Sequence, residues 1–250
     1  MIIDANGLYY RELNRLIREA VAAGETRIHL FNVNGQRYIG DGLKGRITIT
    51  IDGIPGHDLA AFMNGPTIVV NNNAQDGVGN TMNDGKVVVR GNAGDVLGYG
   101  MRGGKLFVQG DVGYRVGIHM KSYKSQVPVI IAGGAAADFF GEYMAGGIMV
   151  LLGLNGAEGN RPVVGDYLAT GMHGGVIYIR GTVEEHQLGK EVGVKELEEE
   201  DYRVLRPLLE EYCQDLDLDI EEVFQGDFIK LLPVSHRPYG ALYALNQRNF

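Results

Sequence analysis

The sequence has 250 residues, a formal net charge of −8 and a single cysteine, and these values exclude several classes of protein. A nucleic-acid-binding protein is not expected, because phosphate contacts depend on clustered Lys and Arg. One cysteine cannot form an internal disulfide, a Cys-ligated zinc site or an iron–sulfur cluster. The start of the chain lacks the features of a signal peptide, and no stretch of about 20 apolar residues occurs. We therefore expect a cytoplasmic protein with neither a nucleic-acid nor a membrane partner.

Residues 1–40 are expected to form an N-terminal cap of one helix and one strand. Apolar residues recur at near-helical spacing between Leu8 and Val21, and Gly24 is typical of a helix stop. The next segment, TRIHLFNV, has the composition of a strand. The helix would cover the first edge of the following sheet, where unpaired backbone groups would otherwise be exposed.

Residues 41–185 carry a repeat of about 19 residues, which is most visible in the methionines. The methionines that mark it are Met63, Met82, Met101, Met120, Met144 and Met172. A small residue stands three places before each of them, at Ala60, Gly79, Gly98, Gly117, Gly141 and Ala169. A glycine closes the apolar run in the five units that follow that of Met63, at Gly91, Gly110, Gly133, Gly153 and Gly181. One further unit is expected to begin at Lys44.

Each unit holds one short β-rich run, and no helix fits between successive runs. The runs are Ile68–Val70, Val87–Val89, Leu106–Val108, Val129–Ile131, Met149–Leu151 and Ile177–Ile179. Strands that return every 19 residues without a helical crossover are typical of a parallel β-helix. The sequence therefore predicts a mainly β protein with about seven coils, in which the methionines fill the interior.

The middle residue of each run is expected to point outward, yet it is apolar in most units. These outward positions are Val69, Val88, Phe107, Ile130, Val150 and Tyr178. An apolar outer face needs a cover. A terminal segment of the chain and a partner subunit are equally good candidates for that cover.

Residues 186–250 are expected to form a helical, acidic extension and a tail. Between Glu184 and Glu222 there are 15 acidic residues against four Lys or Arg, with leucines at helical intervals. We expect one or two amphipathic helices, followed by a short strand near Phe228–Leu232. The acidic residues form either a solvated face or a docking surface for a basic partner. The final SHRPYGALYALNQRNF is apolar enough to pack on the β-helix or on a neighbour.

The search for catalytic and cofactor-binding patterns is negative. GYGMRGG, residues 98–104, fits the G-x-G-x-x-G spacing of a dinucleotide-binding site. Such a site requires a helix after the glycines, but the residues that follow here have the composition of a strand. No two histidines share a metal-ligand spacing, and strict alternation would not place His119 and His173 in one column. Cys213 has no obvious activating neighbour, and no G-x-S-x-G motif occurs. We expect no catalytic, cofactor-binding or metal-binding residues.

Two stretches share the pattern G-x-x-G-x-x-x-G. They are Gly91-Asn-Ala-Gly94-Asp-Val-Leu-Gly98 and Gly110-Asp-Val-Gly113-Tyr-Arg-Val-Gly117. With the Met and strand spacing, this pattern resembles the GXGXG family over about residues 40–185. That family includes the C-terminal domain of the glutamate synthase large subunit and one of the subunits of formylmethanofuran dehydrogenase. The opening YYRELNRLIREAVAAGETRIHLFNVNGQRYIGDGL and the closing SHRPYGALY resemble the free-standing version found where glutamate synthase is divided among separate polypeptides.

The resemblance implies a right-handed parallel β-helix without a catalytic role of its own. In glutamate synthase this domain braces the glutamine amidotransferase domain against the FMN and iron–sulfur synthase domain, between which ammonia travels. We therefore expect a non-catalytic subunit of that complex, with a role in glutamate biosynthesis and nitrogen assimilation. The amidotransferase nucleophile, FMN and the iron–sulfur cluster would belong to partner subunits, since residue 1 is Met and the sole cysteine is Cys213.

Two rival functions stay open. The first is the same scaffold in a formylmethanofuran dehydrogenase complex, where a molybdenum or tungsten subunit would be its neighbour. The second is a hexapeptide acyltransferase, although its left-handed helix repeats an apolar residue every six positions, a period that 19-residue coils do not follow. Acyl transfer that depended on His119 or His173 would favour it. The sequence is also compatible with a homo-oligomer.

Overall fold

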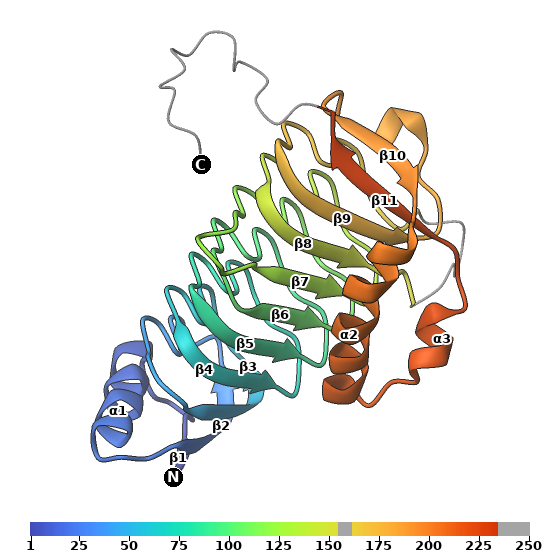
Figure 1. The fold of residues 1–250 in the computed structure, drawn as a ribbon. Helices are drawn as coiled ribbons and strands as arrows, with labels where there is room; N and C mark the ends of the chain where they lie inside the picture. The colour runs from blue at the N-terminus through green and yellow to red at the C-terminus, as the bar shows by residue number, and fades with distance from the viewer. Residues whose placement is uncertain (155–161, 235–250) are drawn as a thin grey trace, which may run out of the picture.

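The computed structural model describes residues 1–154 and 162–234, and its main feature is one sheet of eleven strands. The strands lie side by side in the order β1-β2-β3-β4-β5-β6-β7-β8-β9-β11-β10 (Figure 1). They are β1 (Ile2–Asp4), β2 (Arg27–Asn34), β3 (Thr48–Ile54), β4 (Asn64–Val70), β5 (Asp84–Val89), β6 (Lys105–Val108), β7 (Val129–Ala132), β8 (Ala145–Leu151), β9 (Gly174–Arg180), β10 (Val192–Glu196) and β11 (Phe228–Pro233). The helices are α1 (Tyr10–Ala22), η1 (Glu185–Gln187), α2 (Glu199–Leu216) and α3 (Ile220–Phe224).

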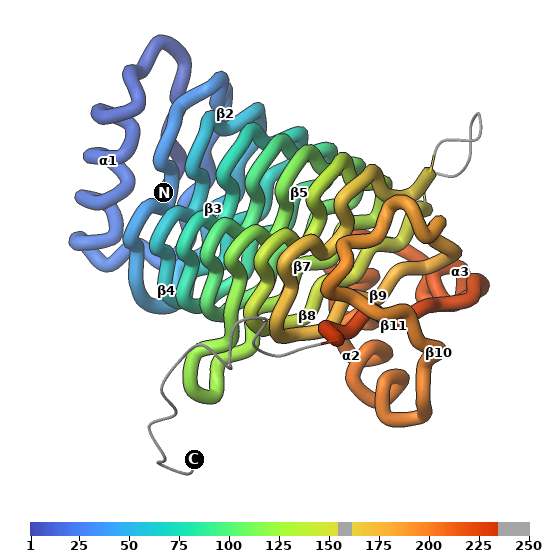
Figure 2. The backbone as a smooth tube through the Cα atoms, turned by 90° about the horizontal axis from the view of Figure 1, so that it is seen from above, coloured from blue at the N-terminus to red at the C-terminus, as the bar shows by residue number. Residues whose placement is uncertain are grey.

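Strands β1 to β9 pair with one another in parallel, and the chain winds once between each strand of the repeat and the next (Figure 2). The protein is therefore a mainly β, parallel β-helix, as the sequence predicts. It has about six turns rather than seven. The seventh expected unit, which begins at Met172, contributes β9, but the chain then returns as β11, which is antiparallel to β9.

The corner that contains GYGMRGG has a left-handed backbone at every second residue. In this coil Val96, Gly98 and Gly100 have φ values of 53°, 64° and 57°. The N–H of Met101 then donates a hydrogen bond of 3.0 Å to the carbonyl of Gly98 and closes a tight turn. This alternation turns the chain sharply, and glycine adopts it without the steric cost of a Cβ atom. The apparent nucleotide-binding motif is thus a corner of the β-helix.

The spacing G-x-x-G has a separate cause, which is a ladder of side chains between coils. Asp76 accepts a hydrogen bond of 3.0 Å from the N–H of Asp95 through Oδ1, and Asp95 accepts one of 2.9 Å from the N–H of Tyr114. A Cβ atom on Gly94 would lie 2.0 Å from Oδ1 of Asp76, and one on Gly113 equally close to Asp95. These glycines leave room for the carboxylates that hold successive coils in register.

A second ladder runs beside the first and uses the other glycine of the pattern. Asn73 accepts a hydrogen bond of 2.8 Å from the N–H of Asn92, and Asn92 accepts one of 2.9 Å from Asp111. A Cβ atom on Gly110 would lie 2.0 Å from Oδ1 of Asn92. Both glycines of G-x-x-G are therefore explained by contact with the preceding coil.

The interior of the β-helix is apolar along its whole length. The repeat methionines Met63, Met82, Met101, Met120, Met144 and Met172 are all 0% exposed. Isoleucine, valine and leucine from the inward positions of the strands surround them in one continuous core. Stacked equivalent positions place like residues above one another, so one residue type can fill a whole column.

The expected phase of the β7 run is wrong by one residue. Leu106 pairs with Ile130, and Phe107 pairs with Ile131, so Ile130 points inward and Ile131 outward. The interval from Met120 to Met144 contains five more residues than the standard 19, and they lie before the strand. Because β7 is apolar at all four positions, its own sequence gives no phase.

The same shift moves the glycine column at this coil. The N–H groups of Gly110, Gly134 and Gly153 donate to the carbonyls of Gly91, Gly110 and Gly134, in that order. Gly134 therefore takes the place expected for Gly133. Gly133 instead follows the position of Gln109, since its N–H donates to Val108 as that of Gln109 donates to Val89.

Helix α1 lies at the N-terminal end of the β-helix, next to β1 and β2 (Figures 1 and 2). It buries Leu13, Ile17 and Ala20 in the main core. The expected strand TRIHLFNV corresponds to β2. Gln36 ties the cap together, since its side-chain amide donates to the carbonyls of Ala5 and Leu8 at 3.0 and 3.1 Å. The cap is continuous with the sheet.

The C-terminal extension, for which one or two helices and a strand were expected, contains the helices α2 and α3 and the strand β11. The pairing of β11 with both β9 and β10 was not expected. The predicted packing of the tail from Ser235 onward lies outside the described residues, as does the resemblance carried by SHRPYGALY.

Candidate functional site

The apolar outer face of the sheet is covered by the chain's own helix α2. Tyr212 is fully buried against Phe107, with ring centroids 5.6 Å apart, and its hydroxyl donates a hydrogen bond of 3.0 Å to the carbonyl of Val108. Leu205, Leu209 and Leu216 join the same cluster, which includes the outer side chains of β5 to β9. Of the two candidates for the cover, the terminal segment of the chain is the one that the structure shows.

Acidic residues near the C-terminal end of α2 form ion pairs with the β-helix. Lys86 Nζ lies 2.5 Å from Asp215 and 3.3 Å from Glu211, and Lys105 also pairs with Glu211. Hydrogen bonding to Lys105 and Lys86 lowers the pKa of Glu211, despite the opposing and larger effect of burial on its own. This part of the acidic run is used inside the chain, whereas Glu199, Glu200 and Glu210 are exposed.

The N-terminal end of α2 is held by a buried polar cluster. Asp201 accepts hydrogen bonds from the Tyr178 hydroxyl at 2.9 Å and from Lys230 Nζ at 2.5 Å. It also accepts one from the N–H of Glu198, the N-cap residue of α2, and so completes a capping box. Burial opposes ionisation of Asp201, but these hydrogen bonds outweigh it and lower the pKa. Burial and the hydrogen bond to Asp201 raise the pKa of Tyr178. Every partner is satisfied, so we read the cluster as an anchor.

Cys213, the sole cysteine, is a residue of α2 and is buried in the cluster between this helix and the sheet. Burial, with a smaller effect of Asp219, raises the pKa of its thiol to about 11. A thiol that stays protonated is a poor nucleophile. Cys213 is therefore placed for packing.

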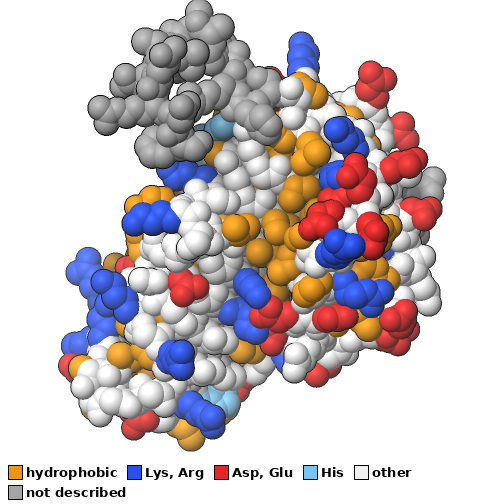
Figure 3. All heavy atoms as spheres, viewed as in Figure 1, with side chains coloured by type: hydrophobic (Ala, Val, Ile, Leu, Met, Phe, Trp, Pro, Cys, Tyr) orange, Lys and Arg blue, Asp and Glu red, His pale blue; other side chains and the backbone are white. Residues whose placement is uncertain are grey.

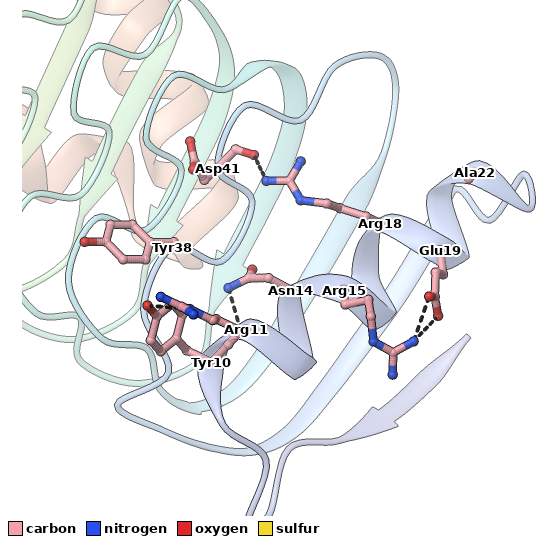
Figure 4. Close-up of a pocket in the computed structure, with 9 residues that line it drawn as sticks. All are labelled: Tyr10, Arg11, Asn14, Arg15, Arg18, Glu19, Ala22, Tyr38 and Asp41. Atoms are coloured by element: carbon pink, nitrogen blue, oxygen red, sulfur yellow. Dashed lines mark hydrogen bonds and ion pairs between the residues drawn. The ribbon is translucent and has the colours of Figure 1, made fainter.

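A hollow of about 510 Å³ lies between α1 and the first coil (Figure 4). Three arginines of α1 line it together with Tyr10 and Tyr38. Each arginine already has a partner: Arg11 donates to the Tyr10 hydroxyl, Arg15 pairs with Glu19, and Arg18 donates to the carbonyl of Asp41. Burial raises the pKa of Asp41, and Arg18 offsets only part of this effect. The hollow lies where the N-terminal cap meets the β-helix, and all three arginines that line it already have partners within the chain.

His119 and His173 line a second hollow, of about 550 Å³, on the corner side of the β-helix. The expectation that they fall in different columns holds, since His119 stands before its methionine and His173 after its own. The structure nevertheless brings both columns to one surface. Sequence reasoning did not find the hollow, but reading the residue after each of the last four repeat methionines would have shown Arg102, Lys121, Ala145 and His173, three of which are basic or imidazole side chains.

No group of three or more His, Cys, Asp or Glu side chains within residues 1–154 and 162–234 could hold a metal ion. The described helices include none that is both long and apolar enough to cross a membrane. On the face of the molecule that carries α2, charged and apolar side chains are intermixed (Figure 3). The outer face of β3, with Thr48, Thr50 and Asp52, lies outside the apolar cluster under α2.

These features define a class: a parallel β-helix protein whose own helix covers part of the outer face of its sheet. Comparison with known proteins gives the family. The GXGXG motif family matches residues 25–233, and the chain belongs to it.

Two similar proteins illustrate the family and the fold. The chain is 51% identical over 251 residues to Uncharacterized protein MJ1350 of Methanocaldococcus jannaschii, which covers 97% of this chain and 96% of that protein. It also resembles a chain in the crystal structure of the formyltransferase/hydrolase complex from Methylorubrum extorquens in complex with methylofuran. That likeness has a TM-score of 0.61 and 18% identity, over 89% of this chain and 87% of the other. It shows a shared fold.

Proposed function

We propose that the protein is the non-catalytic structural subunit of a glutamate synthase divided among several polypeptides. The observation that carries the proposal is the opening segment, residues 9–43, which resembles the free-standing glutamate synthase version of the GXGXG domain. In the structure this segment forms α1, β2 and the first corner, and Gln36 binds it to the carbonyls of Ala5 and Leu8, which precede it. It is an integral part of the β-helix, so the resemblance extends beyond the repeat that all family members share.

In this role the chain supplies rigidity and spacing. The side-chain ladders and the buried methionines fix each coil against the next, and α2 stiffens one face of the stack. The glutamine amidotransferase subunit and the synthase subunit, which would bind FMN and the iron–sulfur cluster, need a fixed separation if ammonia is to pass between them. A stack of coils at about 4.8 Å spacing is suited to set such a separation.

The alternative is the corresponding GXGXG scaffold of a formylmethanofuran dehydrogenase complex. The fold likeness to a chain of the formyltransferase/hydrolase complex favours it, because that chain belongs to a multi-subunit assembly. A β-helical acyltransferase is the weakest candidate, since the family match supports neither the six-residue period nor a catalytic histidine.

Purification of the tagged chain from its native host, with mass spectrometry of whatever accompanies it, tests the proposal. We expect a glutamine amidotransferase subunit and an FMN and iron–sulfur subunit in near-equal amounts, and glutamine-dependent glutamate formation by the purified complex. Recovery with a molybdenum or tungsten subunit would move the chain to the alternative complex. Recovery of the chain alone, or only as a homo-oligomer, would overturn both scaffold roles.

A further inference from the structure

The corner side of the β-helix carries a groove with an unusual balance of charge. Its lining includes Thr81, Arg102, His119, Lys121, Tyr143 and His173. Among the described residues that line it, none is Asp or Glu. The whole chain has a formal net charge of −8, so a cationic lining free of acids stands out from the rest of the molecule. Such a lining attracts an anionic partner.

The groove runs along the axis of the β-helix. Thr81, Arg102, Lys121, Tyr143 and His173 come from five successive coils. Four intervals of about 4.8 Å give a length of roughly 19 Å. A small anion would touch one or two coils, whereas an extended peptide of about six residues, at roughly 3.3 Å each, spans the groove.

Aromatic side chains lie in and beside the groove, next to its cationic residues. The imidazole of His119 stacks on Tyr143, with ring centroids 5.4 Å apart and planes 10° apart, and Tyr99 meets it edge-on at 5.8 Å. Tyr99 is 43% exposed and Tyr143 is 44% exposed. Exposed Tyr beside Arg is the composition that dominates binding energy at protein interfaces.

The backbone at this corner offers little to a ligand. The N–H groups of Thr81, His119 and Tyr143 already donate to carbonyls of the next coil, at 2.7, 3.1 and 2.8 Å. Recognition therefore depends on side chains, and Arg102 and Lys121 are its charged groups. The chain's own residues 235–250 do not fit this role, because they contain Arg237 and Arg248 and no acidic residue.

We propose that this groove is the docking site for an extended, acidic segment of a partner subunit. The inference rests on the proposed scaffold role, and it assigns one surface of the scaffold to one kind of contact. Arg102 and Lys121 pair with carboxylates of the segment, the imidazole of His119 donates a hydrogen bond to it, and Tyr143 packs against its backbone.

The test uses the full chain alone and a dye-labelled hexa-aspartate peptide, with hexa-asparagine as the neutral peptide of the same shape. Fluorescence anisotropy in low salt measures binding. We expect saturable binding of hexa-aspartate, at least tenfold weaker binding in the double variant Arg102→Ala/Lys121→Ala, and no binding of hexa-asparagine. The control variant Arg203→Ala/Arg206→Ala removes the same charge from exposed α2 and should bind as the wild type does. Thermal unfolding checks that each variant folds, and Arg102→Gln/Lys121→Gln replaces the alanine variant if it does not.

Three results would overturn the docking site. Equal weakening of hexa-aspartate binding in the two double variants would show that the peptide responds only to the overall charge of the protein and has no defined site. Displacement of the peptide by inorganic phosphate at equal total charge would show a small-anion site, because phosphate cannot span the coils. Failure of hexa-aspartate to bind would exclude an acidic segment. Since the assay needs no partner subunit, each of these results leaves the co-purification test of the scaffold role intact, and the reverse also holds.

Discussion

The outer face of the sheet differs between its two halves. On β3 the outward residues are Thr48, Thr50 and Asp52, which are exposed or half-buried. On β5 and β6 the equivalent residues include Val88 and Phe107, which are at most 1% exposed beneath α2. The inner face is apolar in both halves. The outward position alone therefore marks where the chain covers itself and where it is open to solvent or to a partner.

The largest test of this comparison removes the centre of the cover. Tyr212→Ala should lower the free energy of unfolding by about 3–5 kcal/mol, because it empties a buried aromatic site and removes the hydroxyl's hydrogen bond to the carbonyl of Val108, which keeps only the N–H of Gly133 as donor. Tyr212→Phe should cost only about 1 kcal/mol, since it loses the hydrogen bond but keeps the ring. Urea unfolding measures both. Thr50→Ala, on the open half, should change stability by less than about 0.5 kcal/mol. A similar cost for Thr50→Ala would contradict the difference between the halves.

The second test asks whether the ladder, rather than the cover, fixes the stacking of coils. Gly94→Ala should cost about 1–3 kcal/mol, because the new Cβ atom would lie 2.0 Å from Oδ1 of Asp76. Asp76→Ala should cost about 1 kcal/mol through its lost hydrogen bond to the N–H of Asp95. The double variant removes the clash, so its cost should fall at least about 1 kcal/mol below the sum. Strict additivity in a urea-unfolding cycle would mean that Gly94 serves some other purpose.

Much of this fold can be predicted from the sequence because a repeat reports the same contact several times. Met101 or Gly98 alone is uninformative, but six copies of each column indicate a stacked core and a tight corner. Spacing shows that Gly98 and Gly94 belong to repeated columns, whereas the left-handed turn at Gly98 and the contact of Gly94 with Asp76 are seen only in the structure. The repeat fails where it is interrupted. At Ile130 the insertion breaks the 19-residue spacing, and the uniformly apolar run shows no alternation between inward and outward residues. Only the pairing with β6 shows which residues of β7 point inward.

The surfaces were harder to predict because they depend on which columns meet in space. The sequence predicts one or two helices between Glu184 and Glu222, and it predicts that the outer face of the sheet needs a cover. It does not show that one of these helices is the element that covers the face. Val108 and Tyr212 are 104 residues apart, and their hydrogen bond depends on the path of the whole extension. The groove was missed for a related reason. Arg102 and His119 occupy different columns, and only the width of the corner brings both to its lining.

A smaller effect is expected at the border between the covered and open halves, where Lys86 pairs with Asp215 and Glu211. Lys86→Met should cost about 1 kcal/mol or less, because the pairs are partly exposed. The cost should shrink in 1 M salt, where charges are screened beyond about 3 Å. Arg203→Met, whose partners Glu199 and Glu200 are largely exposed to solvent, is the control and should cost less still. A loss for Lys86→Met that does not depend on salt would assign its role to packing.

The smallest effect concerns pH and is confined to the covered half. Burial raises the pKa of the Cys213 thiol from 9.0 to about 11, so the folded protein keeps a proton that the unfolded chain loses from about pH 9. Unfolding then releases a proton, and stability falls as the pH rises from about 9 to 11, with no effect below that window. Tyr178 and Tyr212 also have raised pKa values, but they are present in both the wild type and Cys213→Ala and cancel in the difference. Urea unfolding at pH 8, 9, 10 and 11 should therefore show a steeper decline for the wild type than for Cys213→Ala. Parallel declines would mean that the thiol is not sealed from water, and that α2 covers this half of the sheet more loosely than its contacts indicate.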